Sequence, residues 1–534
     1  MMRSLPIAAL AAVLILAPQA QARKRTQLHP YLEVDQTALA DLKNGGPIST
    51  YTSFIGGIDA STSSSRADAQ ISAQYEYRKG WGRNTNDSHV VSGLARGRFD
   101  ILPNLLSLEA GGLAARTRTD IRGTALNPGL GNPSNVSQLY SAYVGPSLST
   151  HVGALNVNGF YRLGYTKVET ETQTFLPGGS PVIGSFDSSI GHAAGLSVGM
   201  KSGLLTFGWT VSGGYSREDA SQLDQRYEGK FARADIVVPL SPTFAVTGGA
   251  GYEKIVASQR DPLFDAGGNP VVTPDGHYVT DPGSPRRLSY DTSGFIWDTG
   301  VLWRPSRRTS LEAKIGRRYG SMTYIGDFSW QISENESFQA GAYDGVTTFG
   351  QQVGGALSRL PTRFVVSRDP FSNQFGGCVF GGAGQGAGAC LSPALQSVSQ
   401  GVYRSRGIGA IYRKTSGRLG WGLAAGYAQR NFHTPPVGGF AINGTTDASV
   451  YVQGGVTYQI DEASVVDTSA YINWYDSGVA GAPRVLGVGG TASYRRNFGP
   501  RLSGTAAVGL YANSVYGVES SLVGAAQLGA RYTF

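Results

Sequence analysis

A strict alternation of apolar and polar residues is the feature that most constrains how this chain can fold. From Ala67 to Tyr77 every second residue is alanine, isoleucine or tyrosine, and the residues between them are Asp68, Gln70, Ser72, Gln74 and Glu76. Residues at a spacing of two share one face of a β-strand. The polar face is too charged for the core of a β-sandwich. The segment therefore predicts a strand with an apolar phase on one side and a polar space on the other.

The same pattern returns along the whole chain. It is clear at residues 419–429 and 448–460, and the sequence between can be cut into pieces of roughly 11 to 15 residues, a length that suits tilted membrane-spanning strands. Glycine occurs 75 times and charged residues make up 15% of the chain, against about 25% in ordinary soluble domains. This composition suits a barrel wall with apolar residues outside and polar residues inside. No linker or change in composition divides the chain.

The connections between these strands alternate in length, which is typical of outer-membrane barrels with short periplasmic turns and long extracellular loops. The longer segments are residues 120–135, 169–189, 258–287, 350–400 and 433–445. The fold class is therefore expected to be all-β, a transmembrane antiparallel up-and-down barrel of about 22 strands, with about 18 to 24 possible. The first strand is expected near His29 to Ala40, too close to the start for a separate plug domain.

The amino-terminal segment has the pattern of a signal peptide. Arg3 precedes an apolar run from Leu5 to Ala17, and the small residues Ala20 and Ala22 follow. A single membrane anchor is the alternative, but it needs roughly 18 apolar residues. We predict a signal peptide at residues 1–22 and a barrel at residues 23–534. An exported barrel of this kind is expected in the outer membrane of a Gram-negative bacterium.

The final stretch, from Ser520 to Phe534, is an amphipathic strand with an aromatic end. Leu522, Leu528, Tyr532 and Phe534 fall on its apolar face. This ending resembles the closing strand of bacterial outer-membrane barrels. The resemblance implies that Tyr532 and Phe534 form a signal that the barrel-assembly machinery reads.

Three other segments carry a closer resemblance. Residues 30–34 (Pro-Tyr-Leu-Glu-Val), residues 316–320 (Gly-Arg-Arg-Tyr-Gly) and the loop from Cys378 to Cys390 resemble a family of exported barrels associated with exosortase (PEP-CTERM) and exopolysaccharide systems. Some members carry the transferred name of a preprotein translocase subunit, a small one-helix protein that this chain does not resemble. The resemblance implies an outer-membrane location and a link to surface polysaccharide, without an activity.

The longest loop, residues 350–400, contains both cysteines of the chain, Cys378 and Cys390. In an exported protein, a pair in one loop is most simply a disulfide. A metal site would need further thiol or imidazole ligands, and this loop has no histidine. Residues 351–362 are expected to form a short helix that folds over or into the barrel mouth. A loop of this length is uncommon unless it has a function, so it is the candidate gate or constriction.

Basic residues near residue 315 offer a hypothesis on selectivity. By strand parity Lys314 and Arg318 should face the lumen, where basic groups can favour anions. Glu312 shares their face, so ordinary charge pairing is the alternative. Arg317 should face outward near the extracellular rim, where it could meet lipopolysaccharide phosphates.

Parity also places Tyr451, Tyr471, Asn473 and Tyr475 in the lumen. Aromatic rings beside an amide can bind sugar rings, so a carbohydrate track is one interpretation. Space-filling tyrosines that form hydrogen bonds across the lumen are the other.

The sequence gives little support to an enzyme. The six histidines lie far apart with no metal-like or nucleophile spacing, and we expect no cofactor. A concentrated basic stripe for nucleic acid is also missing. We expect a passive or loop-gated pore, with polysaccharide or a small solute as the candidate cargo. The alternatives are a non-conducting structural or partner-anchoring barrel, a plugged energised transporter and an outer-membrane hydrolase.

Overall fold

The computed structural model describes the chain from residue 25 onward with several gaps. The described residues are 25–45, 47–81, 87–119, 136–170, 186–203, 205–273, 277–375, 377–399, 401–435, 442–482, 484–516 and 520–534. The predicted signal peptide, residues 1–22, and the predicted loop at residues 120–135 lie outside them.

In this part of the chain, 22 long strands form one antiparallel sheet, which agrees with the predicted number. In chain order they are β1 (Arg25–Asp41), β2 (Ser49–Ser63), β3 (Ala67–Trp81), β4 (Ser88–Leu102), β5 (Leu106–Arg118), β6 (Val136–Val152), β7 (Leu155–Glu169), β8 (Ser188–Met200), β9 (Gly208–Ala220), β10 (Gln225–Pro239), β11 (Phe244–Gln259), β12 (Arg287–Ser306), β13 (Thr309–Arg318), β14 (Ser321–Ser333), β15 (Glu336–Thr347), β18 (Val402–Ser416), β19 (Leu419–His433), β20 (Thr446–Gln459), β21 (Ser464–Asp476), β22 (Val485–Asn497), β23 (Leu502–Val515) and β24 (Ser521–Thr533).

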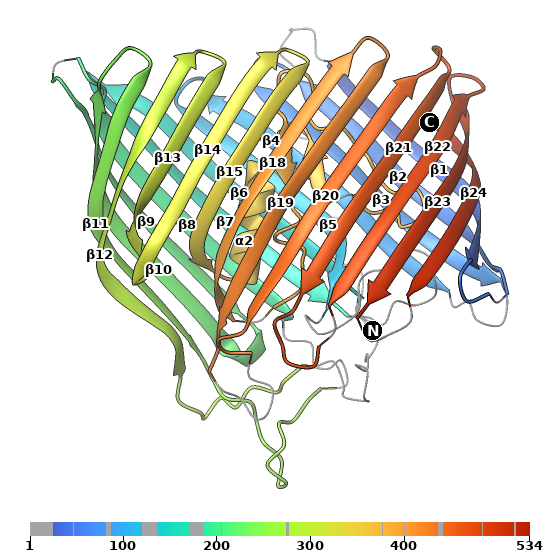
Figure 1. Cartoon of the computed structure of the whole chain (residues 1–534), viewed down its shortest axis with the longest axis horizontal. Coiled ribbons are helices and arrows are strands. Elements are labelled where there is room, and N and C mark those ends of the chain that lie inside the picture. The colour runs from blue at the N-terminus through green and yellow to red at the C-terminus, as the bar shows by residue number, and fades with distance from the viewer. Residues whose placement is uncertain are drawn as a thin grey trace.

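The sheet closes on itself because its first and last strands pair. Tyr31 of β1 lies opposite Gly57 of β2 on one side and opposite Thr533 of β24 on the other. Closure removes the free hydrogen-bonding edge that an open sheet would expose. The expected first and last strands are therefore neighbours, and the chain forms a barrel (Figure 1).

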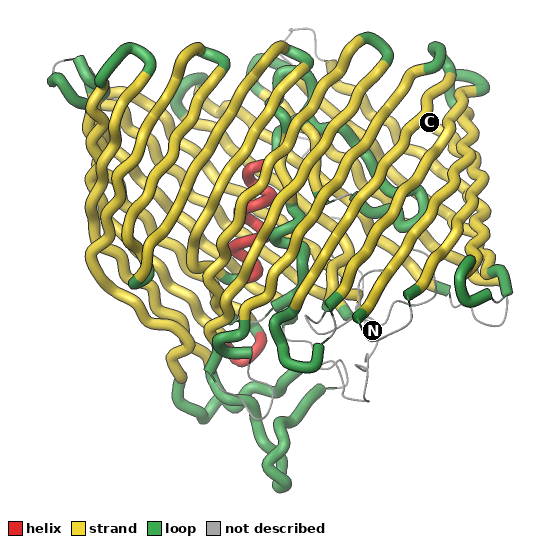
Figure 2. Tube along the Cα trace, viewed as in Figure 1, coloured by secondary structure: helices red, strands yellow, loops and turns green. Residues whose placement is uncertain are grey.

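The two ends of the barrel differ. One rim, at the top of Figures 1 and 2, carries tight turns, and the other carries the long segments, including a ribbon at residues 260–286 that projects below the barrel. Two connections at the long-loop rim are nevertheless short. A 3-10 helix, η2 (Gln222–Asp224), links β9 to β10, and Tyr319 with Gly320 links β13 to β14.

Alternate residues face opposite sides of the wall, and the outward ones are apolar. In β24, Leu528 is 69% exposed while its neighbour Gln527 is 6% exposed. In β23, Val508 is 59% exposed and Ala507 is 4% exposed. A continuous apolar exterior of this kind is stable against lipid and not against water. No helix among the described residues is long and apolar enough to cross a bilayer.

Candidate functional site

The segment between β15 and β18 lies inside the barrel. We call residues 348–401 the insertion. It holds one helix, α2 (Phe349–Arg359), and a small hairpin of β16 (Cys378–Phe380) and β17 (Gly388–Cys390). Figures 1 and 2 show α2 within the ring of strands. The expected helix in residues 351–362 is confirmed, with its end at Arg359.

Wall residues hold both ends of α2. At its start, Thr348 accepts a hydrogen bond from the Gln351 backbone N–H, and its hydroxyl donates to the Glu218 carboxylate at 2.6 Å. A carboxylate beside a helix N-terminus is stabilised by the unpaired backbone N–H groups and the helix dipole. At the other end, the Arg96 guanidinium donates to the carbonyls of Ser358 and Leu360, each at 3.0 Å. Glu218 and Arg96 therefore match the two ends of the dipole.

The apolar face of α2 packs against apolar residues on the inner wall. Phe349, Val353 and Leu357 are almost completely buried in one cluster with residues of β4 to β7. The wall residues in this cluster include Leu94, Leu113, Ala115, Leu139, Tyr143 and Val168. This corrects the expectation of a polar inner face. Here the inner wall is apolar because it faces a helix instead of water.

The polar face of β3 binds the middle of the insertion. Thr362 donates to Asp68 at 2.5 Å, and Gln70 exchanges two hydrogen bonds with the backbone of Phe364, at 2.9 and 3.0 Å. The contacts continue along the strand, with Arg368 on Ser72 and Asn373 on Glu76. The charged face that excludes a sandwich core is therefore a docking surface. Burial lowers the pKa of the Arg368 guanidinium, and nearby Tyr31 and Asp59 oppose that shift.

Strands elsewhere in the ring bind the same insertion. The Tyr511 hydroxyl of β23 donates to Asp369 at 2.7 Å, and Gln453 of β20 accepts from the Cys378 backbone N–H at 2.9 Å. Gln339 of β15 accepts from the Gly388 N–H at 3.2 Å. Around the closed ring β15 is ten strands from β3 and β23 is four strands from it, so the contact with Gln339 of β15 shows that the insertion crosses the lumen and narrows it.

An enclosed ion pair holds the last part of the insertion. Arg430 and Asp447 have no exposed side-chain surface, and the Arg430 Nε lies 3.1 Å from both Asp447 oxygens. Arg430 also donates to the carbonyl of Ser397 at 3.1 Å, and the Tyr475 hydroxyl donates to Asp447 at 3.0 Å. The wall and the insertion therefore share one charged network. Strand parity indicates its inward residues, but nothing in the sequence pairs them.

The predicted disulfide is confirmed. Cys378 and Cys390 are bonded to each other and lie opposite one another in the β16–β17 hairpin. Cys378 belongs to a buried cluster with Ile411, Ala424 and Tyr451 of the wall. The disulfide thus closes a small loop whose base rests on β18 to β20. No group of three or more histidine, cysteine, aspartate or glutamate side chains that could hold a metal occurs among the described residues.

The basic residues proposed for selectivity are paired with carboxylates. Lys314 lies 2.7 Å from Glu312, and the Arg318 Nε donates to Glu253 of β11 at 2.7 Å. These contacts agree with the charge-pairing alternative and give an anion-selective ring no support. The partner Glu253 lies on β11, two strands away from Arg318 on β13.

The four residues of the proposed sugar track do not form an open track. Tyr451 and Tyr475 are 5% and 4% exposed, because the insertion covers them. Tyr471 packs at the edge of a buried cluster around Phe371, while Asn473 is exposed. The space-filling interpretation therefore describes the rings in this arrangement, and the carbohydrate track stays a prediction.

The proposed assembly residues lie at the tight-turn rim. The Tyr532 and Phe534 rings meet edge to face at 5.1 Å, and the Phe534 ring is 63% exposed. The Phe534 N–H donates to the carbonyl of Pro30 at 3.0 Å, which ties the last residue to β1. Recognition by the assembly machinery stays a prediction.

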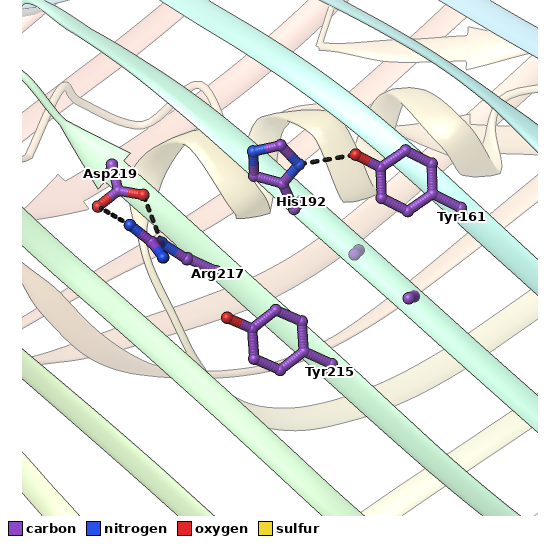
Figure 3. A pocket seen from close by; sticks show the side chains of 7 residues that line it. Tyr161, His192, Tyr215, Arg217 and Asp219 are labelled. Carbon is purple, nitrogen blue, oxygen red and sulfur yellow. Dashed lines mark hydrogen bonds and ion pairs between the residues drawn. The ribbon is translucent and has the colours of Figure 1, made fainter.

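Two pockets lie outside the lumen. The wall pocket, of about 450 Å³, is lined by Tyr161, His192, Ala193, Ala194, Tyr215, Arg217 and Asp219. Figure 3 shows its Tyr161 bonded to His192, at 2.7 Å, and its Arg217 paired with Asp219, at 2.6 Å. The seam pocket, of about 260 Å³, is lined by Tyr290, Tyr319, Arg404, Arg406, Gln429, Asn431, His433 and Thr446. Sequence reasoning singled out neither pocket.

Comparison with known proteins gives limited information. No family model matches the sequence. A search of curated proteins also found no match. Similar solved structures include the FrpB iron transporter from Neisseria meningitidis, with 10% identity, a TM-score of 0.41, and coverage of 94% of this chain and 82% of that one. The ferric-catecholate import receptor Fiu from E. coli, closed form, has 10% identity and a TM-score of 0.47, covering 94% and 82%. The copper transporter OprC has 10% identity and a TM-score of 0.41, covering 95% and 80%. At these identities and scores we draw no conclusion on function from the likeness.

Proposed function

We propose that this chain is an outer-membrane barrel whose lumen is a conduit controlled by the insertion. The closed ring and the apolar exterior support a membrane-spanning barrel, and the contrast between its two rims is typical of outer-membrane proteins. The insertion in its docked position reduces flow. Displacement of the insertion opens the conduit.

One observation carries this proposal: the insertion is bound to opposite sides of the barrel at once. Asp68 and Gln70 of β3 hold residues 362–364, and Gln339 of β15, ten strands away around the ring, holds Gly388. Each such hydrogen bond contributes only about 0.5–1.5 kcal/mol. A set of modest bonds can be released together by a partner or a solute.

A non-conducting structural barrel is the second candidate. The apolar cluster under α2 and the enclosed Arg430–Asp447 pair favour it, because both resemble permanent core packing. In that case the insertion would brace the wall. The two candidates differ in whether removal of the insertion leaves a stable, conducting barrel.

The solute and the partners remain proposals. Surface polysaccharide is the solute that the sequence resemblance favours, and lipopolysaccharide and the assembly machinery are the expected partners. The covered tyrosines mean that a polymer would have to displace the insertion before it could contact Tyr451 or Tyr475.

Deletion of the insertion tests the proposal. Thr347 of β15 pairs with Tyr403 of β18, so a short glycine linker can replace residues 349–400 without moving either strand. We expect single-channel conductance in planar bilayers to rise severalfold over that of the full-length barrel. Shortening the external ribbon at residues 263–279, which lies outside the lumen, is the matched control and should leave conductance unchanged. A deletion variant that folds and stays silent would support the structural candidate instead.

A further inference from the structure

At the long-loop rim, neighbouring strands of the wall end at different heights. The hairpin of β13 and β14 turns at Tyr319 and Gly320, whereas β12 starts at Arg287 and pairs with β13 only from Trp297 onward. Residues 287–296 of β12 therefore have no partner on β13, and most of them extend past the end of the hairpin. Beyond it, the next strands toward β19 are β15 and β18.

The strands on the two sides of the short β13–β14 hairpin overlap. Tyr290 of β12 and His433 of β19 place their rings 4.9 Å apart, although four strands separate β12 from β19 in the sheet order. Tyr227 of β10 likewise donates to the carbonyl of Val346 of β15 at 3.3 Å. His433 shares its parity with the exposed Tyr427, so it faces outward. The inner side of β10 to β12 thus covers the outer side of β15 to β19 at this height, and the seam pocket lies between them.

The lining of the seam pocket is rich in hydrogen-bond donors and contains no carboxylate. It combines two guanidinium groups with an imidazole, two amides, a threonine hydroxyl and two tyrosines. Arg404 and Arg406 share a single counter-ion, Asp344, at 2.7 and 3.2 Å from its Oδ2. The Arg404 side chain is 11% exposed and that of Arg406 is 44% exposed. One positive charge is left over, and Arg406 is the group that a ligand can reach.

We propose that the seam pocket binds a phosphate group carried on a sugar. Guanidinium groups recognise phosphate through paired N–H donors. The Arg406 Nε faces Asp344 and its Nη2 lies 3.4 Å from the Ser321 hydroxyl, so its Nη1 side is the one placed to meet a phosphate. Gln429 can bind a hydroxyl group beside the phosphate. Asn431, whose amide nitrogen donates to the Thr446 hydroxyl at 2.8 Å, can accept another through its oxygen, with Tyr290 as an apolar wall. The volume of about 260 Å³ is near the lower limit of about 300 Å³ for small-molecule sites, which suits one sugar unit and excludes a chain.

The wall pocket offers an internal comparison. It has the same balance of charge, because Arg217 and Arg226 share Asp219, but here the carboxylate is itself part of the lining. An incoming anion would therefore meet a carboxylate there. The same ligand should not bind the wall pocket, so a substitution in it is a matched control.

Calorimetric titration of the full chain in detergent micelles tests the proposal, with glucose 6-phosphate, inorganic phosphate and glucose as probes. We expect glucose 6-phosphate to bind most tightly and glucose most weakly. Arg406→Gln should weaken glucose 6-phosphate binding by about tenfold, because a charge-assisted contact is lost. Arg406→Lys keeps the charge without the paired donors and should fall between, and Arg217→Gln should bind as the unmodified chain does.

Two results would overturn the proposal: equal affinity of Arg406→Gln and the unmodified chain, or an equal loss in Arg406→Gln and Arg217→Gln. If Arg406→Gln fails to fold, Gln429→Ala in its place should weaken the binding of glucose 6-phosphate more than the binding of inorganic phosphate.

A further titration identifies the source of the sugar phosphate. Displacement of bound glucose 6-phosphate by phosphatidylethanolamine vesicles that contain a phosphorylated glycolipid, and not by plain vesicles, assigns the site to a lipid headgroup. Retention in both assigns it to a soluble sugar phosphate.

Discussion

Arg430 and Asp447 show how a single pair of residues can fix the insertion in the lumen. Neither side chain has any exposed surface, and Ser397 and Tyr475 complete the hydrogen bonding around them. Both ions have already lost their water, so their stability depends on each other. Removal of one partner leaves an unpaired charge in a closed space.

We predict that Arg430→Met destabilises the folded barrel by about 3–5 kcal/mol, the usual cost of breaking a buried ion pair. The double variant Arg430→Met with Asp447→Leu should lose less, because both charges of the pair are removed together and only Arg118, over the Tyr475 ring at 4.1 Å, keeps its charge there. Denaturant unfolding of the barrel in lipid vesicles measures both. Arg413→Met, on the inner face of β18 and only half-buried, is the control and should change stability little. A double variant as unstable as the single one would contradict this account.

Sequence parity predicts the face of the wall on which a residue lies, but it does not predict the partner of that residue. It gives the correct face for Arg318 and for Tyr475, because a strand allows only two faces. It cannot give their partners, since Glu253 is 65 residues from Arg318 and Asp447 is 28 residues from Tyr475. Those partners depend on strand register and on the path of the insertion.

A glycine on the inner wall decides how closely α2 approaches. A Cβ atom at Gly111 would lie 3.2 Å from the Leu357 side chain and 2.6 Å from the Tyr143 ring. Leu357 is fully buried, so neither α2 nor the wall has spare room. The absence of a side chain at this position therefore lets the helix dock.

We predict that Gly111→Leu displaces α2 from the wall and weakens its docking by about 1–3 kcal/mol, the typical cost of overpacking. Protease cleavage within the insertion should become faster, and single-channel conductance should rise if the proposed function is correct. Gly294→Leu is the matched control, because Gly294 is on the inner face of β12 with no atom within 4 Å of a Cβ. Equal cleavage rates in the two variants would show that the helix is not held in this way.

The sequence predicted the helix, but it did not predict the part of the wall on which the helix packs. The sequence predicted a short helix in residues 351–362 of the longest loop that folds over or into the barrel mouth. The apolar patch that receives it was missed, because β4 carries apolar residues on both parities, such as Val90 and Val91 or Leu94 and Ala95. A period of two cannot tell which apolar face meets lipid and which meets a helix.

For the whole molecule, the strand number and the closure followed from local signals, since alternating segments and tight turns mark each hairpin in turn. The overlap of β10 to β12 with β15 to β19 did not follow from such signals. It depends on the height of the β13–β14 hairpin relative to β12 and β15, and a two-residue turn at Tyr319 and Gly320 resembles any other turn in sequence. The seam pocket is built by this difference in height, so sequence reasoning had no signal for it.

Closure of the barrel depends on one crowded position between the first and last strands. Gly529 of β24 lies opposite Asp35 of β1, and a Cβ there would lie 1.9 Å from the Asp35 carboxylate. Asp35 is 4% exposed, so it has little room to move aside.

We predict that Gly529→Val prevents β1 and β24 from pairing and lowers the folded, heat-modifiable fraction on SDS gels by about tenfold. Gly455→Val, whose nearest neighbour is the Thr468 carbonyl at 3.5 Å, should fold normally. If both variants close equally well, the β1–β24 pair accepts a larger side chain at position 529 than this geometry allows, and pairing of these two strands does not limit assembly.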